Sequence, residues 1–376
     1  MKIGFDAKRA FLNATGLGNY SRNTLYALRL YFRENDYILF TPEVKEELFK
    51  GYHQFKVVSP QNLVVKKLNS LWRSLFLVSL AKRYEVDIYH GLSNELPKGI
   101  RKSGIPSVVT IHDVVFMRYP EFYNPVDRKI YFKKVKHACK SASRIIAISK
   151  QTQNELVTFF NVPPQKIELL YQPVAPVFFE KQNTGRITRK YNLPDKFILA
   201  VGTLEPRKNQ MSVLKAIHGA DIKVPIVFVG KGTSYKTKLQ RFISENEMEG
   251  QVIFLTNLPE EDLAGLYQCA SVSIYISVFE GFGLPVIEAM ASGCPVITST
   301  VSVLPETAGD AAVLCNPAQF ETIGKELELL LGNEDIRNDL IKKGYERAKL
   351  FHPGDYAKKL ISIYTSILKE YDAKRS

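Results

Sequence analysis

The chain has few cysteines, and no pattern among them would pair them or gather them around a metal. The four are isolated at Cys139, Cys269, Cys294 and Cys315, each among apolar or small residues. This spacing excludes a disulfide framework or a zinc site. It indicates buried free thiols, which are typical of a reducing compartment, and we therefore expect a cytoplasmic protein.

The chain also lacks a long hydrophobic run. No apolar stretch reaches the roughly 18 residues that a transmembrane helix needs. The first residues, Met1–Asp6, carry an acid within an expected strand, which is unlike the apolar core of a signal peptide. A hydrophobic content of 45% and a charged content of 24% over 376 residues are typical of a globular protein with room for two cores.

Acidic residues are scarce in the N-terminal half. Residues 1–178 hold 27 Lys and Arg against 14 Asp and Glu, whereas residues 179–376 hold 24 of each. The whole formal excess of +13 therefore lies in the first half. This asymmetry suggests an anionic partner such as a lipid surface, a phosphorylated acceptor or nucleic acid. Solubility charge without a partner is the alternative.

Strand-like and helix-like segments alternate through both halves, with a proline-rich break at Gln172–Pro176. Such alternation predicts parallel sheets covered on both faces. We predict two doubly wound, Rossmann-like α/β domains facing a central cleft, an N-terminal one over residues 1–175 and a C-terminal one over residues 176–354. A last helix over residues 355–376 is expected to cross back to the N-terminal domain. Ligands of such sheets bind beyond the C-terminal ends of the strands.

Two glutamates eight residues apart, Glu280 and Glu288, bracket the segment Gly281–Pro285. An apolar run, Ser271–Phe279, precedes it as an expected strand, and a helical pattern follows as far as Ala291. Glycines allow a backbone to approach a ligand closely, and the first turn of a helix offers N–H groups to phosphate. Carboxylates, being acceptors only, suit the hydroxyls of a sugar. The segment predicts a nucleotide-sugar site, with an ordinary strand–turn–helix as the alternative.

Adjacent cations follow the first strand of the second half. Arg207 and Lys208 lie in the segment Gly202–Asn209, between a strand and a helix, where they are placed to hold a diphosphate. No Asp-X-Asp motif is present. We therefore expect protein cations rather than a metal ion to stabilise a departing diphosphate. A solvated helix start is the alternative.

Two weaker signals lie in the first half. Gly16 and Gly18 open the first long helix and can turn backbone N–H groups toward an anion, although a flexible loop explains them equally well. His112 and Asp113 end a strand. A histidine there is either a proton carrier or a buried structural residue.

A basic amphipathic helix is expected over Leu63–Arg83. It predicts either packing on its own sheet or contact with an anionic membrane. Its apolar residues at helical spacing are Leu68, Leu71, Trp72, Leu75 and Phe76, and its cations are Lys66, Lys67, Arg73, Lys82 and Arg83.

Taken together, these segments resemble the retaining glycosyltransferases of family 4, which have the GT-B fold. The match over Glu280–Val296 is specific, because it combines two glutamates separated by seven residues with Ala-Met-Ala-Ser-Gly-Cys-Pro-Val. Val201–Asn209, His112–Asp113 and Leu304–Asp310 support it in the same order along the chain. The resemblance covers nearly the whole sequence.

The resemblance implies roles at the glutamate segment. Glu288 is expected to bind the ribose hydroxyls of the nucleotide, and Glu280 to face the donor sugar. The N–H groups of Phe282, Gly283 and Leu284 are expected near the diphosphate and the sugar.

It implies further roles elsewhere. Lys208, in the segment that begins at Gly202, matches the family lysine on the diphosphate. His112 corresponds to the family histidine near the reacting sugar. The loop at Gly16 and Gly18 is expected to close over the donor phosphates.

One position departs from the family pattern. Many members carry an arginine directly after the glycine of the diphosphate segment, where this chain has Thr203. Arg207 is expected to supply the second cation, although the direction of its side chain is not fixed by the sequence.

The activity implied is transfer of a hexose from a nucleoside-diphosphate sugar to a glycan or lipid-linked acceptor, with retention, in surface polysaccharide biosynthesis. No cofactor and no metal are expected. The short Glu-Pro-Arg-Lys-Asn segment looks like the mannosyltransferase-like branch, so GDP-mannose is the expected donor and a UDP-sugar the alternative. The basic half is expected to meet an anionic membrane, which would make the protein peripheral on the inner face of the cytoplasmic membrane.

Two other classes of protein compete with this interpretation. A glycoside hydrolase also uses paired carboxylates, but these two flank a phosphate-type turn. A nucleic-acid-binding protein would explain the basic half, yet no recognition motif is present and aromatic residues do not interleave with the basic ones. We therefore expect no nucleic-acid partner.

Overall fold

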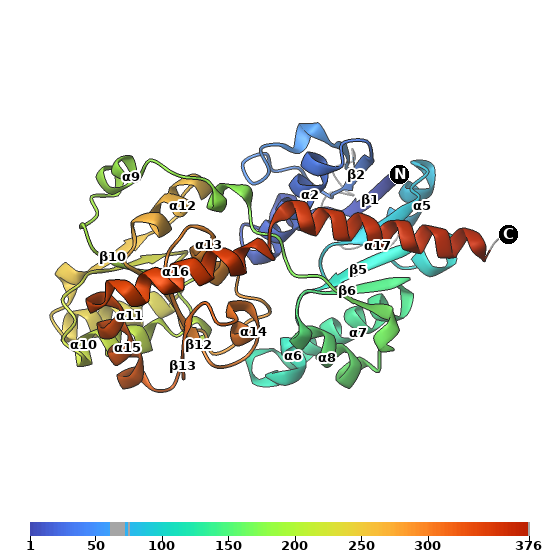
Figure 1. Cartoon of the computed structure of the whole chain (residues 1–376). Coiled ribbons are helices and arrows are strands. Elements are labelled where there is room, and N and C mark those ends of the chain that lie inside the picture. The colour runs from blue at the N-terminus through green and yellow to red at the C-terminus, as the bar shows by residue number, and fades with distance from the viewer. Residues whose placement is uncertain (61–71, 74–75, 375–376) are drawn as a thin grey trace. The chain divides into compact units, whose positions relative to one another are not determined.

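The computed structural model describes residues 1–60, 72–73 and 76–374, and it divides into two compact units. Unit 1 comprises Met1–Pro173 and Pro353–Ser376, and unit 2 comprises Val174–His352. Each unit contains a parallel sheet with helices on both faces (Figure 1). The sequence analysis placed the domain boundaries at residues 175 and 354.

Unit 1 is built on seven parallel strands in the order β3-β2-β1-β4-β5-β6-β7. The central strands are apolar along their whole length because a parallel sheet is covered on both faces. The order reverses between β1 and β4, which pair directly. The strands are β1 (Lys2–Asp6), β2 (Asp36–Phe40), β3 (Lys56–Val58), β4 (Ile88–Gly91), β5 (Ser107–Ile111), β6 (Arg144–Ala147) and β7 (Ile167–Leu169).

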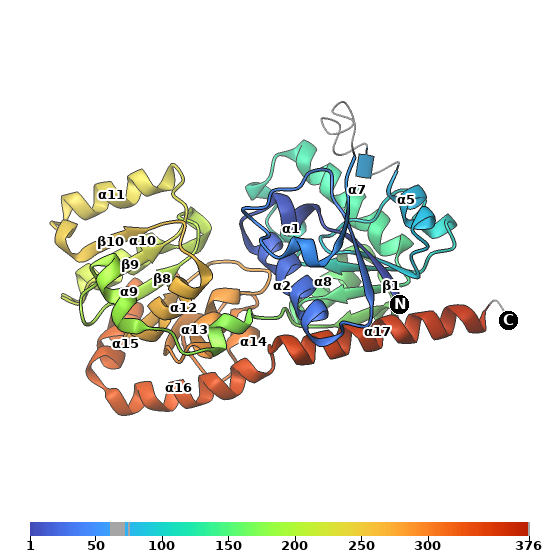
Figure 2. The same ribbon diagram turned by 90° about the horizontal axis from the view of Figure 1, so that it is seen from above.

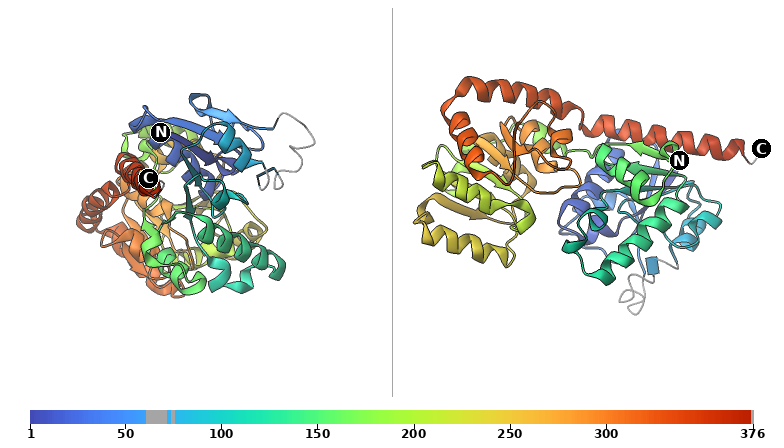
Figure 3. Two further views of the ribbon diagram at one scale, coloured as in Figure 1. Left: turned by 90° about the vertical axis from the view of Figure 1, so that its right-hand side faces the viewer. Right: turned by 90° about the horizontal axis from the view of Figure 1, so that it is seen from below.

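Helices cover the two faces of this sheet with different sets of buried residues. The helices α1, α2 and α17 share one core with the sheet, and α5, α6, α7 and α8 share the other. The bounds are α1 (Lys8–Leu12), α2 (Gly16–Tyr31), α5 (Leu77–Arg83), α6 (Val115–Arg118), α7 (Pro125–Ser141), α8 (Lys150–Phe160) and α17 (Pro353–Ala373). Figures 2 and 3 show α17 lying along one side of the unit 1 sheet.

Unit 2 repeats this plan with six parallel strands in the order β10-β9-β8-β11-β12-β13. Its order reverses between β8 and β11. The strands are β8 (Ile198–Val201), β9 (Ile226–Val229), β10 (Val252–Leu255), β11 (Val272–Tyr275), β12 (Val296–Ser299) and β13 (Val313–Cys315).

The helices of unit 2 complete the doubly wound arrangement. One core contains α10, α11 and α15, while α12 packs against α9, and α13 against α16. The bounds are α9 (Thr184–Tyr191), α10 (Gln210–Gly219), α11 (Tyr235–Glu245), α12 (Glu260–Cys269), α13 (Leu284–Ala291), α14 (Leu304–Ala308), α15 (Phe320–Gly332) and α16 (Glu334–Lys349). The doubly wound α/β fold class expected from the sequence is therefore confirmed in both units.

The last helix, α17, belongs to unit 1. It packs along α2, and a chain of buried hydrogen bonds ties it to the sheet. The Tyr356 hydroxyl lies 2.8 Å from that of Tyr20, and the Tyr364 hydroxyl lies 2.6 Å from His90 Nδ1. Five of its side chains enter the unit 1 core: Tyr356, Ala357, Leu360, Tyr364 and Ile367.

Only part of the expected basic helix over Leu63–Arg83 lies in the described residues. Trp72 is buried in the unit 1 core, and Arg73 is buried with its guanidinium bonded to Asp6 and 3.2 Å from Glu95. Arg73 was counted among the cations of this helix, but two carboxylates hold its side chain inside unit 1, so it is not part of an exposed basic face. Lys66, Lys67, Leu68, Leu71 and Leu75 lie outside the described residues.

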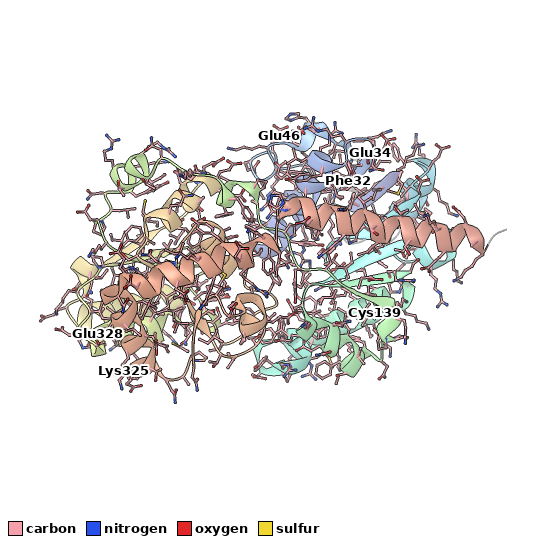
Figure 4. The ribbon with its side chains drawn as sticks, in the orientation of Figure 1. Phe32, Glu34, Glu46, Cys139, Lys325 and Glu328 are labelled. Carbon is pink, nitrogen blue, oxygen red and sulfur yellow. The ribbon has the colours of Figure 1, made fainter. Side chains whose placement is uncertain are left out.

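The four cysteines are free thiols, as expected, but Cys269 is half-buried whereas the other three are buried. Cys139 is buried on α7 (Figure 4), and burial raises the pKa of its thiol to about 12. Within the described ranges, none of the helices is both long enough and apolar enough to span a bilayer.

Candidate active site

The strand order of unit 2 reverses between β8 and β11, and both strands lead into predicted site residues. Gly202 follows β8 directly, and a short 3-10 helix, η6 (Pro206–Lys208), then carries Arg207. Glu280 lies in the connection from β11 to α13. Ligands of open α/β sheets bind at such a reversal, so the topology brings these two connections together at a favourable place.

The carboxylate of Glu280 contacts both predicted cations. Its Oε1 lies 2.5 Å from Lys208 Nζ and 2.9 Å from Arg207 Nη1. Lys208 also donates to the Tyr275 hydroxyl. Arg207 donates to the Phe279 carbonyl at 2.6 Å and to Glu205 at 2.7 Å. These contacts fix the direction of Arg207, which the sequence left open.

This charge cluster is largely shielded from water. Glu280 is 7% exposed, and the side chains of Lys208 and Arg207 are 13% and 32% exposed. Burial alone would raise the pKa of Glu280, but Lys208 and Arg207 outweigh it and lower that pKa to about 2. Glu280 is therefore a carboxylate near neutral pH, held by the groups expected to bind a diphosphate.

A local turn at Asn209 follows Arg207 and Lys208 and fixes where they lie. Asn209 adopts a left-handed conformation with φ of 58°, which asparagine tolerates better than most residues. Its side chain donates to the Pro317 carbonyl at 2.8 Å and accepts from Ser212 at 2.8 Å. The turn ends η6 and starts α10, so Arg207 and Lys208 are held before the helix rather than within it.

The turn before α13 depends on glycine. Gly283 has φ of 96°, and a Cβ there would lie 2.6 Å from Leu304 Cδ2. The helix begins at Leu284, so the N–H groups of its first turn lie at this corner. Phe282 is buried, with its ring 5.7 Å from that of Phe351. Gly202 also has a positive φ, of 147°. Backbone geometry at both glycines is thus one that side-chain-bearing residues rarely adopt.

Glu288 lies on α13, in surroundings that differ from those of Glu280. It is half-buried, and loss of hydration, together with the charge of Glu260 on α12, raises its pKa to about 8. The nearby Tyr267 opposes this shift. The two glutamates therefore differ in protonation near neutral pH, with Glu280 ionised and Glu288 mostly protonated.

Three residues at this corner were not predicted from the sequence. Tyr275 ends β11 and bonds Lys208. Ser302 donates to the Glu280 carbonyl at 2.9 Å, and Thr307 Oγ1 donates to the Phe282 carbonyl. A polar residue at the end of an apolar strand was the available signal for Tyr275. Thr307 lies in the segment Leu304–Asp310, which supported the family resemblance, but nothing local in the sequence marks Ser302, and the partners of both residues lie more than twenty residues away.

In unit 1, the predicted glycines lie at the start of α2. A Cβ on Gly18 would fall 1.7 Å from the Asn13 carbonyl oxygen, whereas a Cβ on Gly16 would meet nothing within 4 Å. Gly18 is therefore required by packing, and Gly16 faces open space. A short helix, α1, lies between β1 and this loop.

His112 follows β5 and is 3% exposed. Its Nε2 lies 2.8 Å from the Leu92 carbonyl, so this nitrogen carries the proton, and its Nδ1 lies 3.1 Å from the Gln172 amide nitrogen. Burial lowers the pKa of the ring to about 4. The ring is thus neutral with both nitrogens paired, which matches the structural alternative considered for it. The Tyr20 ring meets it edge-on at 4.6 Å.

The structure thus brings Arg207, Lys208 and Glu280 into direct contact in unit 2. Glu288 lies about one turn along α13 from its first residue, Leu284, which follows Gly283. The predicted residues of unit 1 form a second group around α2 and the end of β5. Their expected roles toward a donor remain predictions.

Comparison with known proteins identifies the chain. The model of the Glycosyltransferase Family 4 matches residues 15–177, and that of the Glycosyl transferases group 1 matches residues 184–347. The O-antigen chain mannosyltransferase B of Escherichia coli is 30% identical over 289 residues, covering 75% of this chain and 74% of that protein. The serotype-specific mannosyltransferase WbdA of Escherichia coli is 27% identical over 309 residues, but the match spans 38% of its length.

Solved structures agree on the fold. Anabaena HepE in complex with UDP superposes with a TM-score of 0.78 over 97% of this chain and 100% of that one, at 17% identity. Sucrose-phosphate synthase from Thermosynechococcus elongatus superposes with a TM-score of 0.79 over 98% of this chain and 100% of that one, at 19% identity.

Two Rossmann-like units, shared with these solved structures over nearly the whole chain, define the GT-B fold. The chain belongs to glycosyltransferase family 4. This membership confirms the resemblance found in the sequence and favours the transferase over the hydrolase and the nucleic-acid-binding protein.

Proposed function

We propose that this glycosyltransferase moves mannose from GDP-mannose to a hydroxyl of a surface glycan or of its lipid-linked precursor, with retention. The observation that carries the proposal is the cluster of Arg207, Lys208 and Glu280 at the β8–β11 reversal. The choice of mannose rests on relatives named as O-antigen chain mannosyltransferases in Escherichia coli and Salmonella typhimurium.

In the proposed reaction, the bond between the donor's anomeric carbon and its diphosphate oxygen breaks, and a bond from the acceptor oxygen to that carbon forms. The acceptor's proton passes to the departing phosphate, so no separate base is required. Lys208 and Arg207 offset the charge that develops on the diphosphate. The N–H groups of Gly283 and Leu284 supplement these cations, while Glu280 orients the sugar.

Within this proposal, unit 1 contributes through Gly16, Gly18 and His112. The paired, neutral ring of His112 suits a group that shapes the sugar pocket better than one that carries a proton. The basic charge of the first half would meet an anionic acceptor or the membrane that holds it.

A panel of nucleoside diphosphates tests the donor. A ligand at about a hundred times its dissociation constant stabilises a protein by about 2.7 kcal/mol, so GDP should raise the melting temperature well above the values with UDP or ADP. A UDP-sugar is the second candidate, since the fold neighbour HepE binds UDP and UDP-glucose. Stabilisation by UDP alone would replace GDP-mannose as the donor, and no response to any of the three would count against the site.

The cations also predict independence from divalent metals. Because Lys208 and Arg207 are already held at the proposed diphosphate site, mannose transfer should be unchanged after treatment with EDTA. Transfer that disappears with chelator and returns only with magnesium or manganese would contradict the proposal.

A further inference from the structure

The proline-rich break at Gln172–Pro176 begins with a buried glutamine. Gln172 lies three residues beyond Leu169, where β7 ends, and it is 5% exposed. Its side-chain amide nitrogen lies 3.1 Å from His112 Nδ1. Buried polar side chains are almost always hydrogen-bonded, and for this glutamine the partner is the ring of His112.

His112 is held by the connections that follow the neighbouring strands of unit 1. The strands β4, β5, β6 and β7 are adjacent in the sheet, and His112 directly follows β5. Asn94, after β4, accepts from the His112 N–H at 2.8 Å, and Thr152, after β6, donates to its carbonyl at 3.1 Å. The backbone of the histidine is thus fixed from both sides, and its ring is held by the Leu92 carbonyl and by Gln172.

The two contacts of the ring determine which of its nitrogens carries the proton. A carbonyl oxygen can only accept, so the Leu92 carbonyl at 2.8 Å requires a proton on Nε2. An amide N–H can only donate, so Gln172 requires a lone pair on Nδ1. Both partners are satisfied together by one form of the ring, the neutral form with its proton on Nε2.

The titratable groups around the ring favour the same neutral form. Burial raises the pKa of Tyr20 on α2, whose ring meets that of His112 edge-on at 4.6 Å, and burial lowers the pKa of His90 on β4 to about 3. Burial also lowers the pKa of His112 to about 4, and the positive charge of Arg9 on α1 acts in the same direction. A carboxylate at position 172 would oppose both effects and draw a proton to Nδ1, whereas an amide does not.

We propose that Gln172 is a positioning residue for sugar transfer, because its amide N–H holds the His112 ring neutral, with the proton on Nε2, and in one orientation. The inference rests on the proposed function, in which His112 shapes the sugar pocket. A ring that rotates or gains a proton would present a different edge and a different charge to the donor sugar. Such placement affects rate, since a shift of about 1 Å can cost about 100-fold.

Nitrogen NMR of the full-length protein, carrying isotope-labelled histidine, tests the state of the ring without any sugar donor. The chain has six histidines, and the signals that disappear in His112→Asn assign those of His112. The wild type should show a proton on Nε2 and none on Nδ1, with no titration of this ring between about pH 5.5 and 9. A proton on Nδ1 at neutral pH would overturn the inference, whether or not the protein transfers mannose.

Gln172→Glu keeps the shape of the side chain but replaces the donor with an acceptor. Its carboxylate can bond Nδ1 only while a proton stays between the two groups. The His112 signals should therefore gain a titration step between about pH 5.5 and 9, and the transfer rate should fall about tenfold or more as pH rises through that step, because two acceptors then face each other. Gln165→Glu, at an exposed glutamine of the same unit, is the matched control and should show neither change.

Gln172→Met removes the N–H without adding a charge. It should move the Nδ1 resonance and lower kcat about tenfold or more, while GDP affinity stays within about twofold because unit 2 is proposed to bind the nucleotide. Melting temperatures should confirm that the variants fold, and if neither does, the wild-type Nδ1 resonance decides, because a hydrogen bond displaces it. The inference is overturned if Nδ1 resonates alike in Gln172→Met and the wild type, or if Gln172→Glu titrates like its control. A wild type that neither binds GDP nor transfers mannose would count against the proposed function, since the ring measurements need no ligand.

Discussion

Glu280 forms ion pairs with both cations that we propose hold the donor diphosphate. Its carboxylate contacts Lys208 at 2.5 Å and Arg207 at 2.9 Å. A bound diphosphate and this carboxylate would therefore compete for the same positive charge. Releasing Glu280 from the cations would leave it available to the hydroxyls of the donor sugar. In this view the carboxylate takes the place of a phosphate until the donor arrives.

This competition predicts the direction in which GDP affinity changes when the charge of Glu280 is removed. Sequence reasoning alone expects Glu280→Gln to leave nucleotide affinity nearly intact while transfer falls. The ion pairs change this expectation for nucleotide binding. Without the Glu280 charge, about 1 kcal/mol of pairing with the two cations no longer opposes GDP, so GDP affinity should rise about fivefold. The transfer rate should fall at least about 100-fold. Isothermal titration and a transfer assay would measure the two effects.

Glu205 provides the matched control for this experiment. Its carboxylate pairs with Arg207 at 2.7 Å but forms no ion pair with Lys208 among the described residues, so Glu205→Gln should change GDP affinity less. A Glu280→Gln protein with full transfer activity, or with much weaker GDP binding, would contradict the assignment.

The raised pKa of Glu288 predicts that nucleotide binding depends on pH. Burial and Glu260 raise its pKa to about 8, so most of its carboxyl is protonated at pH 7 and ionised above pH 9. If the carboxylate accepts ribose hydroxyls, GDP affinity should rise with pH across this window. Glu288→Gln should abolish the rise, and Glu260→Gln should move it to lower pH, because a neighbouring charge is removed. Titrations of the wild type and both variants with GDP between pH 6.5 and 9 would check these three expectations. A wild-type GDP affinity that does not change with pH would refute the proposed role of Glu288 in binding the ribose.

At the scale of elements, buried tyrosines anchor α17. Tyr364→Phe should leave His90 Nδ1 without its partner at 2.6 Å. An unpaired buried polar group costs about 1–3 kcal/mol of unfolding free energy. The matched control is Tyr371→Phe on the same helix, whose hydroxyl bonds the Gly104 carbonyl at an exposed position. Denaturant unfolding should show a clear loss for the first variant and a smaller one for the second. Equal losses would mean that the buried bond contributes little.

Elements were predictable from the sequence wherever the signal was local. Apolar strands alternating with helical patterns predict both sheets, and the glycines before Leu284 predict the strand–turn–helix corner. The run Ser271–Phe279 was expected as one strand, but β11 ends at Tyr275, and the N–H of Val278 bonds the Arg207 carbonyl at 2.9 Å. That bond joins segments far apart in the sequence, so periodicity could not reveal it.

The same limit applies to the candidate site. The positions of Lys208 and Glu280 after strands were predictable, but their ion pair joins residues 72 positions apart and follows from the pairing of β8 with β11. The burial of Arg73 was missed for a related reason. Its partner Asp6 lies 67 positions away, and a basic residue beside an apolar stripe is typical of a solvated helix edge.

For the whole molecule, charge and chemistry divide between the units. The formal excess of +13 lies within residues 1–178, which make up nearly all of unit 1 apart from α17. The cation–carboxylate cluster lies in unit 2. We expect unit 2 to bind the nucleotide and unit 1 to be required for the acceptor.

A chain that ends at His352 tests this division. It lacks α17, whose five buried side chains enter the unit 1 core. Four of the five are large, and at about 1.5–3 kcal/mol for each large side chain buried, their loss is comparable with the 5–15 kcal/mol that stabilises a typical domain. Unit 1 should therefore unfold or melt early, while unit 2 keeps its own core and its site.

Calorimetry should show one remaining transition that GDP still shifts upward, and mannose transfer should be lost. A chain ending at Ala373 is the control and should behave like the full-length protein. Transfer by the shorter chain, or a remaining transition that GDP no longer shifts, would show that the two functions do not divide in this way.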